Sequence, residues 1–361
     1  GGKMLDDVHE ECGICAVYIK EDGDAANRAL FSLYKLMLNL QNRGQLSAGV
    51  TTYNANRAQI LDTYKDIGHV NEVFRTSNQE KSFQIFKRYA GNKGIGHVRY
   101  ATSGSDDVGV AQPFERHHGK KWKWFSFGFN GNLANYSELK KKLLAKGEYH
   151  LTYDNDTEIM MHYISLELRT KKKPDLVRVF SNLSKKFDGC YNITFINAEG
   201  EIAVVRDPHG FRPLVYGFSE DKKVFMAASE SVALVNSGIK DIKPLPPGHM
   251  VHISDGSIKI KKYADAKRKS HCMFEWVYFS NVSSVLDDRS VYITRTNLGK
   301  ELAKLETQKI DKDCIVVPVP DTAKAAGDAF AYELGIPSRE GIIRNRYVGR
   351  TFIEGSSRDD K

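Results

Sequence analysis

The chain has 361 residues, of which 41% are hydrophobic and 27% are charged, a composition that excludes wholesale disorder, collagen and a coiled coil. This length is typical of one large domain or of two domains. The net charge of +8 favours anionic partners, but the lysines lie in short, scattered clusters, so we expect solvated surface rather than a nucleic-acid site.

The cysteines and the N-terminal segment indicate a reducing compartment. Five cysteines form an odd and sparse set, which argues against a secreted disulfide scaffold and favours the cytoplasm. No apolar run reaches the length of about eighteen residues that a membrane span needs, so we expect no membrane partner. The polar start shows no signal peptide, and Met4 after Gly-Gly-Lys indicates that the first three residues are a cloning remnant.

The first two-thirds of the chain alternates strand-like and helical patterns. Residues 12–19 predict a buried strand, and apolar residues at helical spacing predict a helix over 27–40. Further helices are expected to begin at Ser137 and at Asp156, where Asp156 is a good N-cap. Strands are predicted at 191–196, 201–205, 223–228 and 248–253. This pattern indicates an α+β fold.

The last third begins with a change of composition. Residues 255–271 are rich in lysine, serine and aspartate and are expected to form a linker. Beyond it, the pattern predicts a helix over 291–306, a buried strand over 314–319, a helix over 322–334 and a strand over 340–344. This is the start of an open α/β sheet, but too few residues follow to complete one.

Cys12 is the first residue whose chemistry must be weighed. A thiolate is a strong nucleophile but needs a base, and the α-amino group of Cys12 could serve if the chain were cut before it. The segment alone favours a buried structural cysteine. Cys12 and Cys15 also have the spacing of a redox or metal pair. No second Cys/His pair supports a metal, however, and strand alternation points the two thiols to opposite faces.

Three other short segments carry residues suited to binding a small amino acid. Arg99 is followed by hydroxyl residues, as in a carboxylate clamp, although surface arginines are common. Asn130 stands beside Gly131, which suits an oxyanion hole or a plain Asn-Gly turn. Asp156 could bind an ammonium group or only cap a helix.

The ordered combination of these segments resembles the class II glutamine amidotransferases, and among them the amidophosphoribosyltransferases of purine biosynthesis. The motifs lie at residues 12–14, 41–49, 96–104, 130–133, 156–158 and 206–214, and later segments at 228–234, 272–279, 317–322 and 344–353 fit the second, narrower family. The resemblance covers residues 9 to 353, nearly the whole chain.

The resemblance implies an N-terminal-nucleophile αββα sandwich over residues 12–262, followed by a partial α/β phosphoribosyltransferase-type domain over 263–361. Residues 1–11 resemble a propeptide whose removal makes Cys12 the first residue. Its thiolate would then attack the side-chain amide of L-glutamine, with its α-amino group as general base. Asn130 and the Gly131 N–H match the oxyanion hole of the family.

The resemblance also assigns residues to substrates. Arg99, with Thr102 close behind it, matches the grip on the α-carboxylate of glutamine, and Asp156 matches the residue that holds the α-ammonium group. Arg43 belongs to a loop that closes over the site. Ammonia released there would pass to phosphoribosylpyrophosphate, giving 5-phosphoribosylamine.

In the second domain, Asp321 matches a phosphoribosylpyrophosphate-binding loop, and Thr322 is expected to meet Mg²⁺. Arg344 and Arg350 belong to a second loop that closes over the same substrate. Cys272 matches the first cysteine ligand of a 4Fe-4S cluster carried by some family members. The family forms tetramers, so a homo-oligomer is expected.

Some positions depart from the family pattern. Asn42 and Phe129 stand where histidine is usual, and Leu46 stands where an acidic residue is usual. The family also continues for roughly a hundred more residues, so this chain is expected to carry mainly the glutaminase half. The alternative is an unprocessed or degenerate amidotransferase-like regulatory or scaffold subunit without synthase activity.

Overall fold

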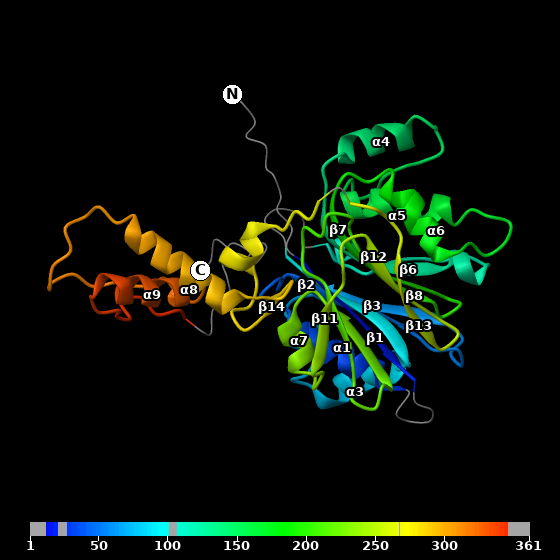
Figure 1. Cartoon of the computed structure of the whole chain (residues 1–361). Helices are drawn as coiled ribbons and strands as arrows, with labels where there is room; N and C mark the ends of the chain where they lie inside the picture. The colour runs from blue at the N-terminus through cyan, green and yellow to red at the C-terminus, as the bar shows by residue number, and fades with distance from the viewer. Residues whose placement is uncertain (1–11, 21–26, 101–106, 267, 346–361) are drawn as a thin grey trace.

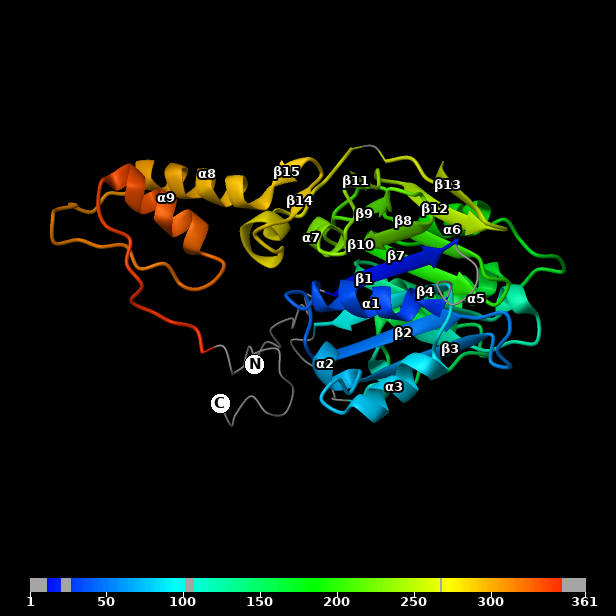
Figure 2. The same ribbon diagram turned by 90° about the horizontal axis from the view of Figure 1, so that it is seen from below.

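The computed structural model describes residues 12–20, 27–100, 107–266 and 268–345. Two antiparallel sheets lie face to face, helices cover the outer face of each, and a helical arm projects from one end (Figure 1). Seen from below, the arm extends away from the two sheets (Figure 2).

The first sheet has seven strands. They are β1 (Gly13–Ile19), β2 (Ser47–Tyr53), β3 (Leu61–Ile67), β4 (Lys93–Arg99), β9 (Val215–Phe218), β10 (Val224–Ala228) and β11 (Asp241–Pro244). Their order is β11-β9-β10-β1-β4-β2-β3, with β1 at the centre. The outer face is covered by α1 (Ala29–Leu38), α2 (Val70–Val73), α3 (Gln79–Arg88) and α7 (Ser231–Val235).

The second sheet has six strands. They are β5 (Phe114–Arg116), β6 (Phe125–Leu133), β7 (Gly189–Asn197), β8 (Ile202–Arg206), β12 (His249–Ser254) and β13 (Ser257–Lys262), in the order β13-β12-β8-β7-β6-β5. Its outer helices are α4 (Tyr136–Leu144), α5 (Asp156–Glu167) and α6 (Leu176–Ser184). Short 3₁₀ turns at Val108–Val110 and Lys121–Lys123 lie before β5 and β6.

Strand alternation distributes the core over three layers. Phe125 and Phe127 of β6 pack against α5 and α6 on the helix side of the six-stranded sheet. Val17 of β1 packs against α1 on the other outer side. Ile14 and Ile95 lie between the two sheets. This arrangement confirms the expected αββα sandwich, because each sheet has two buried faces and only the outer ones need helices.

The chain after β13 forms the arm. A π-helical turn, η4 (Glu275–Phe279), is followed by the small hairpin β14 (Val285–Leu286) and β15 (Arg289–Ser290), by α8 (Val291–Lys304) and by α9 (Lys324–Leu334). Arg206 at the end of β8 donates to both carboxylate oxygens of Asp287, at 2.7 and 2.8 Å, and so ties the hairpin to the sandwich.

Several predicted elements differ from the observed ones. Residues 255–271 are not all linker, because 257–262 form β13. The expected buried strand over 314–319 is wrong: Val316 makes only an isolated bridge to Ser338, while Ile315 and Val319 are more than half exposed. No strand forms over 340–344. A strand needs a neighbour to pair with, and in the described part of the arm the bridge between Val316 and Ser338 is the only pairing these segments have.

Among the described residues, no helix combines the length and the apolar character that crossing a membrane requires.

Candidate active site

The predicted catalytic residues converge on one end of the space between the two sheets. On β4, Ile95 faces this space, so His97 and Arg99 share its face. On β6, Phe127 and Phe129 point to the helix side, so Asn130 points to the space between the sheets. These residues therefore approach one another from opposite sheets.

Cys12 lies at the same end. The β1–β4 ladder pairs Gly13 with Val98, and continuing this register by one residue sets Cys12 opposite Arg99. Cys12 is 1% exposed. Cys15 instead lies in the cluster between β1 and α1, and burial raises the pKa of its thiol. No disulfide joins the two cysteines, and the described residues contain no cluster of metal-binding side chains, so the redox and metal interpretations gain no support.

The predicted oxyanion residues lie at the C-terminal end of β6. Asn130 is fully buried, yet neither atom of its side-chain amide hydrogen-bonds to any described part of the chain. Gly131 has φ +155°, and an added Cβ would lie 2.0 Å from the carbonyl oxygen of Cys190 on β7. A buried amide without a partner costs free energy, so such a group is expected where a ligand or water binds.

Asp156 lies beside this strand end, because the Leu133 N–H donates to its Oδ2 at 3.4 Å. The expectation that Asp156 caps α5 is wrong by one residue. Asn155 is the N-cap, accepting from the Glu158 N–H at 2.8 Å, and Asp156 is the first helical residue. Because Asn155 caps the helix, the Asp156 carboxylate is not needed for that task.

Arg43 lies on the loop after α1 but is buried in an ion-pair network. Its Nε donates to Glu230 at 2.6 Å, and its two Nη atoms donate to the carboxylate of Glu275. Burial alone would raise the pKa of Glu275, but the guanidinium groups of Arg43 and Arg212 hold it below its ordinary value. In this structure Arg43 therefore joins the sandwich to the first turn of the arm, and its contact with glutamine stays a prediction.

The same loop packs closely on the catalytic strands. An added Cβ on Gly13 would lie 3.5 Å from the Arg43 Cδ, and one on Gly44 would lie 2.4 Å from the carbonyl carbon of Arg99. The Leu46 N–H also donates to the Arg99 carbonyl at 3.1 Å. The ion-pair network and the candidate nucleophile are thus neighbours.

In the arm, two predicted phosphoribosylpyrophosphate residues meet. Arg344 donates to Asp321 at 2.8 Å, and Thr322 comes one residue before the N-cap of α9, Ala323. Thr102 and Arg350 lie outside the described residues.

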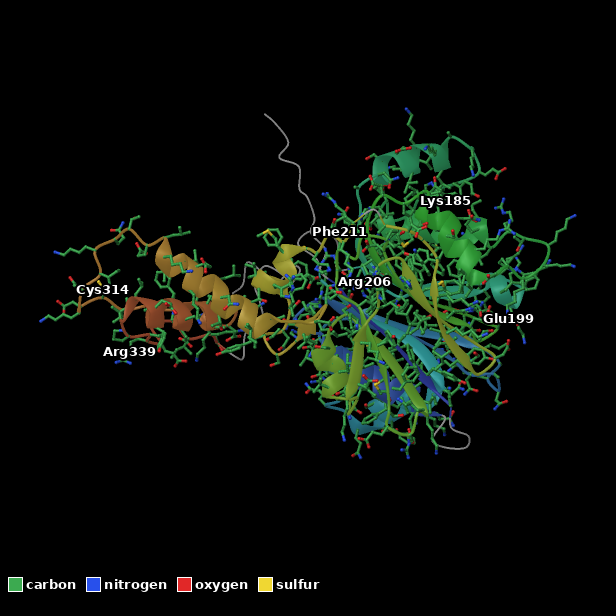
Figure 3. All side chains as sticks on the ribbon, in the orientation of Figure 1. Lys185, Glu199, Arg206, Phe211, Cys314 and Arg339 are labelled. Carbon is green, nitrogen blue, oxygen red and sulfur yellow. The ribbon has the colours of Figure 1, made fainter. Side chains whose placement is uncertain are left out.

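Both predicted metal sites stay predictions. An Mg²⁺ bound through one or two protein oxygens and substrate phosphates is compatible with Asp321 and Thr322. A 4Fe-4S cluster requires four thiolates, and the described residues do not supply them. Cys272 donates its N–H to Phe211 next to the sandwich, whereas Cys314 lies at the distal side of the arm (Figure 3). Cys314 is therefore not the partner of Cys272, and the role of Cys272 as a first cluster ligand stays a prediction.

Four residues of this region were not predicted from the sequence. His97 and Gln112 bind the backbone of β6, and Glu230 and Glu275 bind Arg43. The buried position of His97 in a strand was the available signal for the first. The partners of Arg43 come from positions 187 and 232 residues away, which no local pattern reveals.

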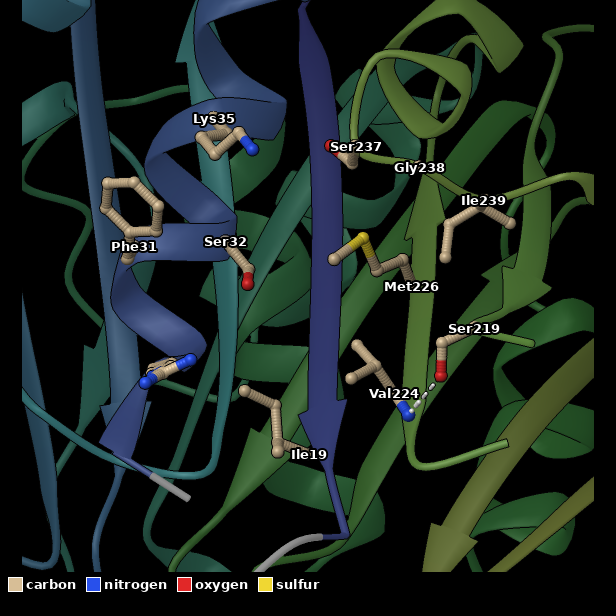
Figure 4. Close-up of a pocket in the computed structure, with 11 residues that line it drawn as sticks. Ile19, Phe31, Ser32, Lys35, Ser219, Val224, Met226, Ser237, Gly238 and Ile239 are labelled. Atoms are coloured by element: carbon tan, nitrogen blue, oxygen red, sulfur yellow. Dashed lines mark hydrogen bonds between the residues drawn. The ribbon is translucent and has the colours of Figure 1, made fainter. Parts of the chain in front are cut away.

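A cavity of about 290 Å³ lies elsewhere, between α1 and the β10–α7 side of the seven-stranded sheet (Figure 4). Its lining includes Phe31, Lys35, Met226 and Ile239, and none of the predicted site residues. The chemistry of the convergent residues, rather than cavity size, therefore identifies the candidate site.

The stacked sheets and the residues at their shared end define a glutamine amidotransferase domain of the N-terminal-nucleophile class. The glutamine amidotransferase domain family matches residues 97–236. The chain belongs to the amidophosphoribosyltransferase family. It is 36% identical over 352 residues to the amidophosphoribosyltransferase of Methanothermobacter thermautotrophicus, covering 96% of this chain and 68% of that protein.

Further relatives agree. The Escherichia coli amidophosphoribosyltransferase is 35% identical, over 89% of this chain and 64% of its own length. The solved structure of the glutamine phosphoribosylpyrophosphate amidotransferase of Bacillus subtilis, in complex with ADP and GMP, superposes with a TM-score of 0.78 at 31% identity, covering 95% of this chain and 69% of that one. A structure of the allosteric regulatory enzyme of purine biosynthesis superposes with a TM-score of 0.80 at 31% identity, covering 95% of this chain and 68% of that one. The chain thus spans about two thirds of the length of its relatives.

Proposed function

We propose that this chain carries the glutaminase half of a glutamine-dependent amidophosphoribosyltransferase. It would hydrolyse glutamine to glutamate and ammonia, and the ammonia would pass to phosphoribosylpyrophosphate to give 5-phosphoribosylamine. The observation that carries the proposal is the convergence of Cys12, Arg99 and Asn130 at one end of the space between the sheets.

In the first step, the Cys12 thiolate attacks the side-chain carbonyl carbon of glutamine, forming an S–C bond. The Asn130 side-chain amide and the Gly131 N–H stabilise the oxygen that becomes negatively charged. The C–N bond then breaks, and the α-amino group of Cys12 returns the thiol's proton to the leaving ammonia. This step requires removal of residues 1–11, which is part of the proposal.

In the second step, water attacks the glutamyl thioester. The new C–O bond replaces the S–C bond, glutamate leaves, and the thiol regains its proton. Arg99 and Asp156 hold the α-carboxylate and α-ammonium groups of glutamine throughout. The fixed distance from these two residues to Cys12 and Asn130 selects an amino acid with a side-chain amide of the right length.

We propose that the arm contributes to the synthase half of the reaction. Asp321, Thr322, Arg344 and Arg350 would bind phosphoribosylpyrophosphate, with Mg²⁺ neutralising its pyrophosphate when bound. Guanidinium groups are suited to this substrate because they bind phosphate oxygens in pairs. We also propose a cytoplasmic homo-oligomer, tetrameric as in the family.

A glutaminase assay on the purified chain tests the proposal. Glutamate release should be saturable in glutamine, and Asn130→Ala should lower kcat by about 10²–10³-fold, as loss of one oxyanion donor does. Thr51→Ala, which removes a hydroxyl from a different part of the same layer, should leave kcat unchanged. Glutamine binding without hydrolysis by the wild type would favour the regulatory-subunit alternative instead.

A further inference from the structure

The Phe129 peptide, one residue before Asn130, is held from outside its own sheet. Its N–H donates to the Gln112 Oε1 at 2.7 Å, and its carbonyl accepts from the His97 Nε2 at 3.0 Å. Gln112 comes from the segment before β5, and His97 comes from β4 of the facing sheet. Two side chains thus replace the backbone partner that a neighbouring strand would supply.

The sheet topology explains why these partners are needed. β5 pairs with β6 only as far as Phe114 opposite Phe127. Beyond that point the edge of β6 has no strand beside it, and the Phe129 N–H and carbonyl point to this edge. A buried backbone group without a partner is unfavourable, so the side chains of Gln112 and His97 complete the edge where the oxyanion residues begin.

Both side chains are buried, and Gln112 is also fixed by hydrogen bonds. The Lys65 Nζ donates to the carbonyls of Ala111 and Pro113, at 2.6 and 3.3 Å, which flank Gln112 on both sides. The Gln112 Nε2 also donates to the Thr157 hydroxyl at 3.3 Å. Gln112 and His97 are 2% and 0% exposed. These contacts fix Gln112, whereas His97, whose Nδ1 has no hydrogen-bond partner among the described residues, is confined by the burial of its ring.

Resting on the function proposed above, we propose that His97 and Gln112 are positioning residues for glutamine hydrolysis. They hold the Phe129 peptide so that the Asn130 amide and the Gly131 N–H point at the reacting oxygen. In this role they act through the Phe129 backbone rather than on the nucleophile or on the α-groups of glutamine. Their loss therefore impairs transition-state stabilisation more than substrate binding.

The protonation state of His97 is consistent with this role. Burial lowers the pKa of His97 to about 3, so the ring is neutral in the working pH range. A carbonyl only accepts hydrogen bonds, so the Nε2 of the neutral ring carries the proton. His97 therefore acts as a fixed donor and exchanges no proton during turnover.

The test compares two substitutions of matched length. His97→Gln keeps an N–H donor near the position of the imidazole Nε2, whereas His97→Met fills similar space without a donor. Since a misplacement of about 1 Å can cost about 100-fold in rate, we expect His97→Met to lower kcat 10- to 100-fold. The KM for glutamine should change less than about twofold, and His97→Gln should recover most of kcat with an unaltered pH profile.

Gln112→Met provides the second variant if His97→Met does not fold, and it should lower kcat in the same way. Ser126→Ala is the control. Ser126 lies elsewhere on β6, and the substitution removes its buried hydrogen bond of 2.6 Å to Thr51 of β2, so kcat should be unchanged. Backbone hydrogen exchange in peptides covering 127–131 should rise in both Met variants and stay near the wild-type rate in His97→Gln.

The outcomes separate the two proposals. Absence of glutaminase activity in the wild-type chain overturns the proposed function, and this inference with it. An active wild type whose folded His97→Met and Gln112→Met variants keep full kcat overturns the positioning role alone. Equal loss in His97→Gln and His97→Met, or a changed pH profile in His97→Gln, also contradicts it.

Discussion

Replacing Arg43 by Met should strongly destabilise the protein. Arg43 is 1% exposed and donates to two carboxylates, of Glu230 and Glu275, whose side chains are fully buried. Its removal leaves two buried negative charges, with Arg212 still at 3.6 Å from Glu275. Breaking a buried ion pair by removing one partner costs about 3–5 kcal/mol, and the second carboxylate places this case at the upper end.

Arg75→Met is the matched control. Arg75 also forms an ion pair at 2.6 Å, with Asp66, but its side chain is 49% exposed. Exposed pairs contribute about 0–1 kcal/mol, so this variant should unfold nearly as the wild type does. Both variants lose one arginine, but Arg43→Met loses two buried ion pairs where Arg75→Met loses one exposed pair. Two exposed pairs would contribute at most about 2 kcal/mol, so a larger loss in Arg43→Met reports burial.

Urea unfolding followed by tryptophan fluorescence measures the difference. Trp276 reports on the affected region through Arg295, which donates to the backbone carbonyls of both Trp276 and Ser280. The Ser280 hydroxyl in turn accepts from Arg43. The midpoint should fall by several times more in Arg43→Met than in Arg75→Met. Equal and small shifts in both would refute the reasoning that the Arg43 network is desolvated in the folded protein.

Three other predictions concern charge, backbone and capping. The pKa of Glu275 is lowered in the folded state, so its ionised carboxylate stabilises the folded protein. This stabilisation is complete above the ordinary pKa of 4.5 and is lost as the pH falls through the lower pKa of the folded state. The unfolding midpoint of wild type should therefore exceed that of Glu275→Gln by a constant amount from about pH 8 to about pH 5, and the gap should narrow below about pH 4. Gly131→Ala should abolish measurable glutaminase activity, since its Cβ would lie 2.0 Å from the Cys190 carbonyl oxygen, whereas Gly119→Ala, with nothing within 4 Å, should be neutral in the same assay. Glu158→Ala should cost about 1–3 kcal/mol in urea unfolding, because its carboxylate accepts from three consecutive N–H groups before α5; an unchanged midpoint would contradict this.

The sequence was most informative where local pattern and packing agree. The buried run at residues 12–19 became β1, and the apolar face over 27–40 became α1, because each pattern is satisfied by the sheet layer beside it. The order of short motifs indicated the family and the αββα sandwich, which the fold and the relatives confirm.

The sequence was least informative where the outcome depends on distant partners. The segment from Cys314 to Val319 is apolar enough for a buried strand, but a strand also needs neighbours, and it has only one bridge in the described arm. Asp156 and Asn155 are equally good caps on local grounds, and the geometry of the turn selected Asn155. His97 and Gln112 have no local signature of their role, because it arises from the edge that β5 leaves open.

The most direct test of the central claim is to treat the purified chain with 6-diazo-5-oxo-L-norleucine, an electrophilic glutamine analogue, and to map the adduct by peptide mass spectrometry. The proposed mechanism predicts one adduct per chain, on a peptide that begins at Cys12, with protection by excess glutamine. Cys15, Cys190, Cys272 and Cys314 should remain unmodified. A chain that retains residues 1–11 and shows no glutamine-protected adduct at Cys12 would contradict the account.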